Sequence, residues 1–575
     1  MLMMQNVPTT GLPGLKVSVA KLPRSPLSIT AQTLTDFLNQ DSRSRLSPES
    51  NRPLLMPFEI ALRSKGQLIF SQWLEGHSPY RAINDVLNAE PDSDLLQLTI
   101  VISRRALSQD NWQSELSAEK NGRSALEITL HGATEKVSPF ETIATNRSLE
   151  RWFEIRLKQK VLTVGAFFAL GGQIALLECH QFALPCQEQS VAFETYRGSG
   201  IVEKDSPATI LADQIISGIS RWFMTNQEKD GALPYKYWPS AGTYSEADNP
   251  IRRFMASVVF NRLADALDSQ NIRAAARKNL TYNLNRFYRT MEGNGAIYWN
   301  ESVKLGALAI SGQAIIESPY HFEWRDQLDA IRKTIDKLWQ PSGAFRTFLY
   351  PHDRNDNQNF YPGEALVFWA TSLAQDKHEG LLNRALKSLE YYRGHFHKRP
   401  NPAFVPWHSQ AATTIYRLTG EIALRDYVFE MNDWLLPHQQ WGGELDRDYW
   451  GRFYTPSKPE YGPPHASATG VYLEGLVDAL ALAQEAGDRG RAELYLEAIE
   501  RGIRSIAQLQ FRDYSDAFYI SRPERVIGAV RTESDNNEIR IDNMQHALAA
   551  LLKFKALSKD FSNRTVLAKT ATQGV

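Results

Sequence analysis

The residues best suited to chemistry are concentrated between positions 437 and 474. This segment carries Glu444, Asp446 and His465 together with two tryptophans, and helical patterns flank it on both sides. A connection between helices usually needs only a few residues, and long loops rich in charged and aromatic side chains often carry function. The segment therefore predicts part of a site, with carboxylates and imidazole to transfer protons and indole rings to cover the flat faces of a ligand.

Five other loops carry the same mixture of side chains. The candidates for catalysis are the carboxylates and histidines of these loops: Asp248, Glu364, His408, Asp446, His465, Asp542 and His546. The candidates for holding a substrate are aromatic, cationic and amide side chains and one further carboxylate: Lys236, Trp238, Tyr244, Arg253, Trp299, Lys304, Tyr361, Trp407, Trp441, Glu444, Trp450, Arg531, Arg540 and Gln545. No set of metal ligands with a known spacing is present, so we expect neither a metal nor a cofactor.

These residue types support three kinds of function. Glycoside hydrolysis needs a proton donor and a second carboxylate. Epimerisation or elimination beside a carbonyl or a uronate carboxylate needs histidine or tyrosine bases, for which His408, His465 and His546 qualify, and arginine or lysine to hold the anion. A non-catalytic site that binds a glycan or a peptide uses the same side chains without turnover.

Composition limits the possible partners. The chain has 575 residues, which predicts two large domains, and its 64 basic and 65 acidic side chains leave no net field for nucleic acid or an anionic membrane. Its cysteines, Cys179 and Cys186, do not form a secreted disulfide framework. The N-terminus lacks the pattern of a signal peptide, so we expect a cytoplasmic protein.

Residues 16–200 predict an α+β domain with a substantial sheet. Apolar runs of strand length occupy 54–62, 67–74, 95–103 and 125–132, and helical patterns occupy 30–39, 80–90 and 147–159. The apolar run 161–178 predicts two buried strands around a glycine turn. The strand pair followed by SPYRAINDVL (78–87) resembles the AMMECR1-like α+β domain. A protein partner docked on this domain is one role that we consider for it.

The rest of the chain predicts an all-α domain over 205–558, between flexible tails at 1–15 and 559–575. Twelve helical patterns follow one another: 207–226, 249–267, 270–292, 304–317, 322–340, 361–375, 379–397, 407–419, 421–439, 466–486, 490–511 and 543–557. Long and short connections alternate, and a glycine-aromatic phrase such as KDGALPYKYW (229–238) recurs after the odd helices. The even helices are rich in small and apolar residues, and the odd helices carry charged residues on one side.

This pattern resembles the six-hairpin (α/α)6 toroid of many carbohydrate-active enzymes. The resemblance implies an inner ring of even helices whose starts meet at one mouth. It also implies catalysis by a carboxylate pair, for which Asp446 and Asp542 are the first candidates. We therefore predict an enzyme that binds an oligosaccharide or smaller saccharide, preferably an anionic, uronate-like one, and hydrolyses it. An epimerase or lyase is the alternative.

Overall fold

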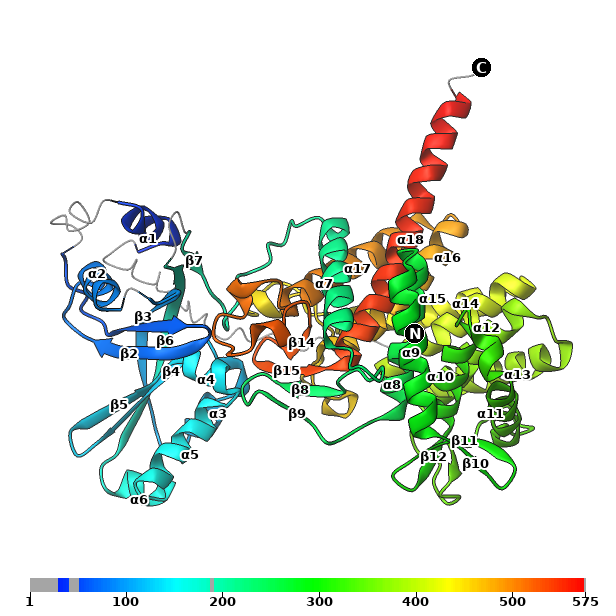
Figure 1. Cartoon of the computed structure of the whole chain (residues 1–575), viewed down its shortest axis with the longest axis horizontal. Helices are drawn as coiled ribbons and strands as arrows, with labels where there is room; N and C mark the ends of the chain where they lie inside the picture. Colours follow the sequence, from blue (N-terminus) through cyan, green and yellow to red (C-terminus); the bar gives the residue numbers. More distant parts are fainter. Residues whose placement is uncertain (1–28, 41–50, 91, 187–190, 573–575) are drawn as a thin grey trace, which may run out of the picture.

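The chain folds into a sheet-rich part and a helical part, which lie side by side in the computed structural model (Figure 1). The structure describes residues 29–40, 51–90, 92–186 and 191–572. The predicted tail at 1–15 lies outside these ranges. The sheet-rich part takes up the described residues to about 200, and the helical part takes up the rest.

The sheet-rich part is built on one antiparallel sheet with the strand order β2-β1-β3-β6-β4-β5, in which β7 also pairs with β6. Its strands are β1 (Phe58–Ser64), β2 (Gln67–Leu74), β3 (Leu95–Leu107), β4 (Ser124–Leu130), β5 (Ala133–Val137), β6 (Gln173–Pro185) and β7 (Phe193–Glu194). The four apolar runs predicted as strands are β1 to β4, so those predictions are confirmed. Strand β1 is buried along nearly its whole length because other elements cover both faces of the sheet.

Six helices accompany the sheet: α1 (Ala31–Leu38), α2 (Pro79–Ala89), α3 (Trp112–Glu115), α4 (Pro139–Thr145), α5 (Leu149–Gln159) and α6 (Val164–Ala169). The prediction of two strands over 161–178 is wrong in its first half, which forms α6. The cause is local, because the hydroxyl of Thr163 accepts a hydrogen bond from the backbone N–H of Ala166 and so begins a helix.

The helical part contains twelve α-helices among its described residues, at the positions that the sequence predicts. Six of them form an inner set: α8 (Pro250–Ala266), α10 (Leu305–Ile316), α12 (Tyr361–Gln375), α14 (Val405–Thr419), α16 (Ala466–Glu485) and α18 (Ile541–Thr572). The other six form an outer set: α7 (Ala208–Asn226), α9 (Gln270–Phe287), α11 (Arg325–Leu338), α13 (Glu379–Lys398), α15 (Ile422–Leu435) and α17 (Arg489–Leu509).

The inner helices pack in a closed cycle. Helix α8 contacts α10, and the contacts continue through α12, α14 and α16 to α18, which returns to α8. Each outer helix packs on one inner helix, as α9 does on α8 and α7 on α18. Because the cycle has six members, helices three positions apart, such as α12 and α18, stand on opposite walls.

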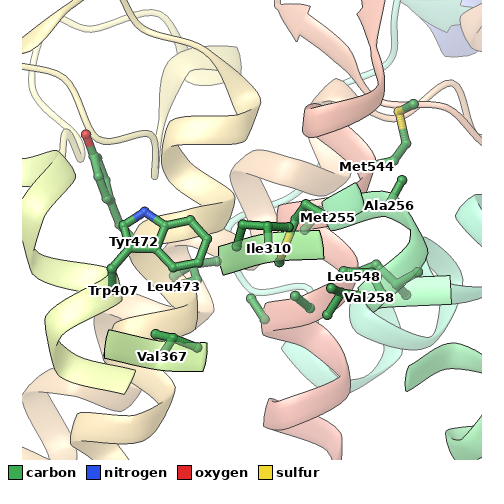
Figure 2. Close-up of a cluster of buried hydrophobic side chains, with 14 of the residues drawn as sticks. Met255, Ala256, Val258, Ile310, Val367, Trp407, Tyr472, Leu473, Met544 and Leu548 are labelled. Carbon is green, nitrogen blue, oxygen red and sulfur yellow. The ribbon is translucent and has the colours of Figure 1, made fainter. Parts of the chain in front are cut away.

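The centre of this cycle is apolar below its mouth. Every residue of α10 is buried, and Figure 2 shows side chains from all six inner helices directed toward one cluster, among them Met255, Ile310 and Leu548. Among the described residues, α16 is the one helix long and apolar enough to cross a membrane by composition, and 78% of its apolar window is buried inside the protein. It packs against α14, α17 and α18 as a core helix.

Two small sheets organise the loops that lead into the inner helices. One sheet has the order β10-β11-β12-β13 and the other β14-β15-β8-β9. Their strands are β8 (Lys236–Trp238), β9 (Thr243–Tyr244), β10 (Tyr288–Met291), β11 (Asn294–Trp299), β12 (Ser302–Lys304), β13 (Phe348–Tyr350), β14 (Arg531–Glu533) and β15 (Asn536–Arg540). Pairing of β15 with β8 joins the last loop to the first.

Two helix ends differ from the prediction. Helix α9 stops at Phe287 rather than 292 because the chain turns into the hairpin of β10 and β11. Helix α18 continues to Thr572, beyond the predicted end at 557, because no proline or glycine interrupts 558–572. Short 3-10 turns complete the chain: Ala118–Lys120, His321–Trp324, Pro402–Phe404, Leu436–His438, Arg447–Tyr449, Pro459–Tyr461, Tyr514–Asp516 and Pro523–Arg525.

Candidate active site

A cavity of about 330 Å³ opens where the inner helices begin, and we call it the mouth cavity. Five inner helices line it with residues from their first turns, and loop residues between 438 and 463 close one side. The polar lining comes from Arg252 on α8, Glu364 on α12, His465 at the start of α16, and Asp542 and His546 on α18. Chain segments almost 300 residues apart therefore meet at one site.

Glu364 is the most perturbed acid in this cavity. Its side chain is buried, its Oε2 has no hydrogen-bond partner among the described residues, and burial raises its pKa to about 8. Gly306 on the neighbouring α10 makes room for it, because a Cβ atom at that position would overlap Oε2. Glu364 is therefore protonated at neutral pH and able to donate a proton to a bound molecule.

The pKa of Asp542 is shifted in the opposite direction. Its carboxylate accepts hydrogen bonds from Arg540 at 2.7 and 2.8 Å and lies 2.9 Å from Nε of Arg252. Burial acts to raise its pKa, but the guanidinium groups of Arg252 and Arg540 outweigh that effect and hold the pKa well below its usual range. Asp542 therefore stays ionised, and its oxygens are largely occupied.

His546 is oriented by a buried carboxylate. Its Nδ1 lies 2.7 Å from Oε1 of Glu474, which projects from α16 and is fully buried. A carboxylate can only accept, so Nδ1 of His546 carries the proton in this pair. Nε2 of His546 has no partner among the described side chains, and it is left to exchange a proton at the cavity.

His465 presents a donor to the same cavity. Its Nδ1 accepts the backbone N–H of Ala468 at 3.0 Å, which caps the start of α16, and lies 2.7 Å from the hydroxyl of Ser467. Burial, with a smaller effect from Arg540, lowers its pKa to about 4, so the ring is neutral. Because a backbone N–H can only donate, Nδ1 is unprotonated and Nε2 carries the hydrogen.

Aromatic rings form much of the wall. The rings that line the mouth cavity are Phe360, Tyr361, Trp407, Phe453, Tyr454, Tyr461 and Tyr472. Figure 2 shows the indole of Trp407 directed toward Ile310. Gln545 adds an amide whose buried Oε1 has no partner among the described residues. Flat rings with a few polar groups between them suit the faces and hydroxyl groups of a sugar.

His408, a predicted catalytic residue, does not line this cavity. Its ring is fully buried, stacks on Phe404 at 3.5 Å, and donates from Nδ1 to the carbonyl of Phe404. Burial lowers its pKa to about 3. The preceding residue, Trp407, takes the place at the cavity, because one step along a helix turns a side chain by about 100°.

Asp248 also lies outside the mouth cavity. Its carboxylate pairs with Arg253 at 2.6 Å and with Arg286 at 3.2 Å. It borders a second cavity, described below, together with Trp299 and Lys304. The guanidinium group of Arg253 is therefore paired with Asp248, while its neighbour Arg252 lines the mouth cavity.

Most predicted residues of the 437–474 segment lie outside the mouth cavity. Asp446 accepts a hydrogen bond from the buried Arg197 at 2.7 Å. Trp441 packs against Trp450 with a ring distance of 5.4 Å, and Glu444 is exposed. Arg531 is buried and donates to the carbonyl of Arg197 and the hydroxyl of Ser199. Asp446 and Arg531 therefore join the two parts of the molecule. The two tryptophans pack near Arg504 of the outer helix α17 instead.

The first loop contributes little to the mouth cavity. Lys236 and the indole N–H of Trp238 both contact Glu538, at 3.0 and 3.2 Å. Tyr244 is 42% exposed, and its ring packs against the ring of Tyr237. Arg540 contributes indirectly, by holding Asp542.

Several lining residues were not among the predicted site residues, namely Asn249, Tyr472 and the aromatic residues at 453–461. Helical register could have indicated Tyr472, because it faces inward within two turns of the start of an inner helix. His546 was predicted, but its pairing with Glu474 could not be read from the sequence. Among the described residues, no three His, Cys, Asp or Glu side chains group so as to hold a metal ion.

Comparison with known proteins gives matches among solved structures only. No family model and no curated protein matches the chain. A D-mannose isomerase is 12% identical with a TM-score of 0.47, and the match covers 61% of this chain and all of that chain, 100%. An unsaturated glucuronyl hydrolase specific for heparin is 11% identical with a TM-score of 0.44, over 61% of this chain and 98% of the other.

A family 76 glycoside hydrolase from a bovine Bacteroides thetaiotaomicron strain is 10% identical with a TM-score of 0.43, and the match covers 81% of this chain and 97% of that chain.

Proposed function

We propose that the helical part is an (α/α)6 toroid and that the mouth cavity is the active site of an enzyme that epimerises or isomerises a saccharide. One observation carries the proposal: a protonated acid, Glu364 on α12, stands on the wall opposite a carboxylate-oriented histidine, His546 on α18. An acid and a base on either side of a substrate are what proton transfer beside a carbonyl requires.

Each group has a role in this reaction. Nε2 of His546 removes the proton from the carbon next to the carbonyl of the open-chain sugar, and the carboxyl group of Glu364 donates a proton to the carbonyl oxygen. These two transfers give an enediol. The isomer forms when the former carbonyl carbon takes the proton from His546 and the neighbouring hydroxyl passes its proton to Glu364. The epimer forms when the original carbon takes a proton from solvent on the opposite face, the enediol hydroxyl returns its proton to Glu364, and His546 releases its proton to solvent. Glu474 is a positioning residue, because it holds Nδ1 of His546. His465 and Gln545 offer hydrogen bonds to sugar hydroxyl groups.

The charges of the mouth cavity favour a neutral sugar ring. Arg252 is the one cation among its lining residues, and it is paired with Asp542. Glu364 and His465 are uncharged at neutral pH. The anionic preference predicted from the sequence therefore gains no support from this cavity alone.

Glycoside hydrolysis is the second candidate. The environment pushes the pKa of Glu364 up and the pKa of Asp542 down, which is the pattern of a general acid beside an ionised carboxylate. We place hydrolysis second because two guanidinium groups occupy Asp542 and weaken it as a base or nucleophile. Asp446 belongs to the contact with the sheet, so Asp446 and Asp542 do not share this cavity.

The test is conversion of sugars in D₂O followed by NMR. The expected result is a new aldose or ketose that carries solvent deuterium on the carbon next to the carbonyl. Glu364→Gln should abolish this exchange, whereas Glu390→Gln, on the exposed face of α13, should not. New reducing ends from oligosaccharides without carbon-bound deuterium would indicate hydrolysis instead. Saccharide binding without any turnover would indicate a non-catalytic site.

We further propose two domains, 16–200 and 205–558. Separate apolar clusters in the sheet-rich part support this division, such as the one around Leu34, Ile83 and Leu98. One large cluster fills the helical part and reaches the sheet through a few residues, among them Phe140. A protein partner for the sheet-rich domain remains a prediction.

A further inference from the structure

A second cavity, of about 420 Å³, opens beside the mouth cavity and meets it at Asn249. We call it the side cavity. It lies between the start of α8, the turn from β11 to β12, and the loop after β13. Its lining residues include Trp299, Ser302, Lys304 and Arg354. Neither the acid nor the base of the proposed reaction lines it.

Two cations face the side cavity. Lys304 has no carboxylate within ion-pair distance among the described residues. Burial and the nearby positive charge of Arg354 lower the pKa of Lys304, and a smaller effect of Asp356 opposes them. Arg354 pairs with Asp356 at 2.7 Å on the outer side. Like charges held close together without a bridging anion are unfavourable, and an anion between them would remove the repulsion.

The carboxylates of the side cavity do not supply that anion. Asp248 lies between Arg253 and Arg286, and both of its oxygens are occupied. Glu301 is exposed at the rim. The cavity therefore keeps a local excess of positive charge around Lys304.

Two further features favour an anion here. The indole N–H of Trp299 is buried and has no acceptor among the described residues, which leaves a donor in need of a partner. Helices α8 and α10 both begin at this cavity, at Pro250 and just after Lys304, and helix N-termini attract negative charge. The lysine ammonium and the indole N–H together supply donors for an oxyanion.

We propose that the side cavity binds an anionic substituent, a phosphate or a carboxylate group, of the saccharide whose carbonyl end occupies the mouth cavity. This inference rests on the proposed function for the sugar, but the anion site itself does not. The arrangement separates two tasks: the mouth cavity, whose Arg252 and Asp542 are paired with each other, performs proton transfer, and Lys304 with Trp299 selects sugars that carry a negative charge. The junction at Asn249 is where one molecule would span both cavities.

The experiment is calorimetric titration of the full chain with inorganic phosphate, glucose, glucose 6-phosphate and glucuronate, for the wild type, Lys304→Met and Lys333→Met. Lys333 is an exposed lysine on α11 and serves as the matched control. The expected result is that one charged sugar binds about tenfold more tightly than glucose, and that K304M removes this advantage while K333M keeps it. Tighter binding of glucose 6-phosphate identifies a phosphate site, and tighter binding of glucuronate identifies a carboxylate site.

Equal affinity for charged and neutral sugars, or unchanged affinity in K304M, would overturn the proposal. The inorganic phosphate titration separates this failure from that of the proposed function. Phosphate binding that depends on Lys304, without conversion of any sugar, supports the anion site and contradicts the enzyme. Conversion of sugars that is insensitive to K304M supports the enzyme and contradicts the anion site.

Discussion

The mouth cavity and the contact between the sheet and the helical part both contain buried charged side chains, and they satisfy those charges differently. In the mouth cavity, Oε2 of Glu364 has no partner among the described residues. The contact, which we call the seam, joins the sheet to the helical part through Arg197, Asp446, Asp448, Arg452 and Glu533. In the seam every one of these charges has an opposite charge within 3.0 Å.

The seam is a structural arrangement. Nη1 of Arg197 donates to both oxygens of Asp448 at 2.7 and 2.6 Å, and the ring of Tyr449 lies between Arg197 and Arg452. Their hydrogen-bonding capacity is used within the seam, so they serve to hold the two parts together. An unpaired buried carboxylic acid costs stability and keeps its proton, which makes it a candidate for catalysis when it lines a cavity. Burial alone therefore does not identify the active site. Glu364 is distinguished because it is buried, has an oxygen without a partner among the described residues, and lines the mouth cavity.

The largest expected effect comes from Glu364→Gln, which removes the proton donor and preserves the shape of the side chain. Turnover of the converted sugar should fall about a thousandfold. The mutant should remain folded, because the wild-type carboxyl makes no hydrogen bond through Oε2 that could be lost. Steady-state kinetics with Glu390→Gln as the control checks this. A loss below tenfold would remove Glu364 from the mechanism.

Arg197→Met should lower the stability of the protein but leave the activity of the folded fraction unchanged. It leaves Asp448 buried and unpaired, so the free energy of unfolding should fall by about 3 to 5 kcal/mol. Arg447→Met breaks only an exposed pair with Glu203 and should cost less than about 1 kcal/mol. Denaturant midpoints measure both variants. If the folded fraction of Arg197→Met lost its activity, the seam would not be purely structural.

Glu474→Gln tests the positioning of His546. The amide keeps the contact with Nδ1 but removes the negative charge, so kcat should fall about a hundredfold with little change in KM. The pH profile of kcat should shift as well, since the imidazole loses its ionic partner. A drop in stability with an unchanged pH profile would instead make Glu474 a packing residue.

Gly306→Ala has a smaller expected effect. The added methyl group would overlap Oε2 of Glu364 and press on Tyr361, which moves the acid away from the substrate. Activity should fall about tenfold, because catalytic groups tolerate little displacement. Gly394→Ala is the matched control, since a Cβ atom there meets nothing within 4 Å. Unchanged activity in Gly306→Ala would mean that Glu364 does not depend on this space.

The sequence predicts the elements well because the periodic patterns are strong. Each helix of the cycle is visible as an apolar stripe, and the alternation of loop lengths indicates which ends meet. Residues that directly begin or follow the start of an inner helix, such as Glu364, His465 and Asp542, could therefore be predicted to lie close together. Their convergence depends only on helix register and on the closure of the cycle.

Loop side chains could not be predicted in the same way. Asp446 and Trp441 belong to an irregular loop, and the partner that draws Asp446 into the seam, Arg197, lies 249 residues earlier. The prediction that His408 lines the site is wrong for another reason. His408 follows the lining residue Trp407 directly, and one step along a helix turns the side chain away from the cavity. Glu364 is protonated because it is buried and its Oε2 has no hydrogen-bond partner among the described residues. The sequence does not show which side chains surround a buried carboxyl group.

The central claim is that Glu364 is protonated at neutral pH. Infrared difference spectra between wild type and E364Q, recorded across the pH range, report the carbonyl stretch of this one carboxylic acid. Because burial raises the pKa of Glu364 to about 8, its acid band should be present at pH 7 and disappear as the pH rises through that value, together with activity. A carboxylate band for Glu364 already complete at pH 6 would contradict the account.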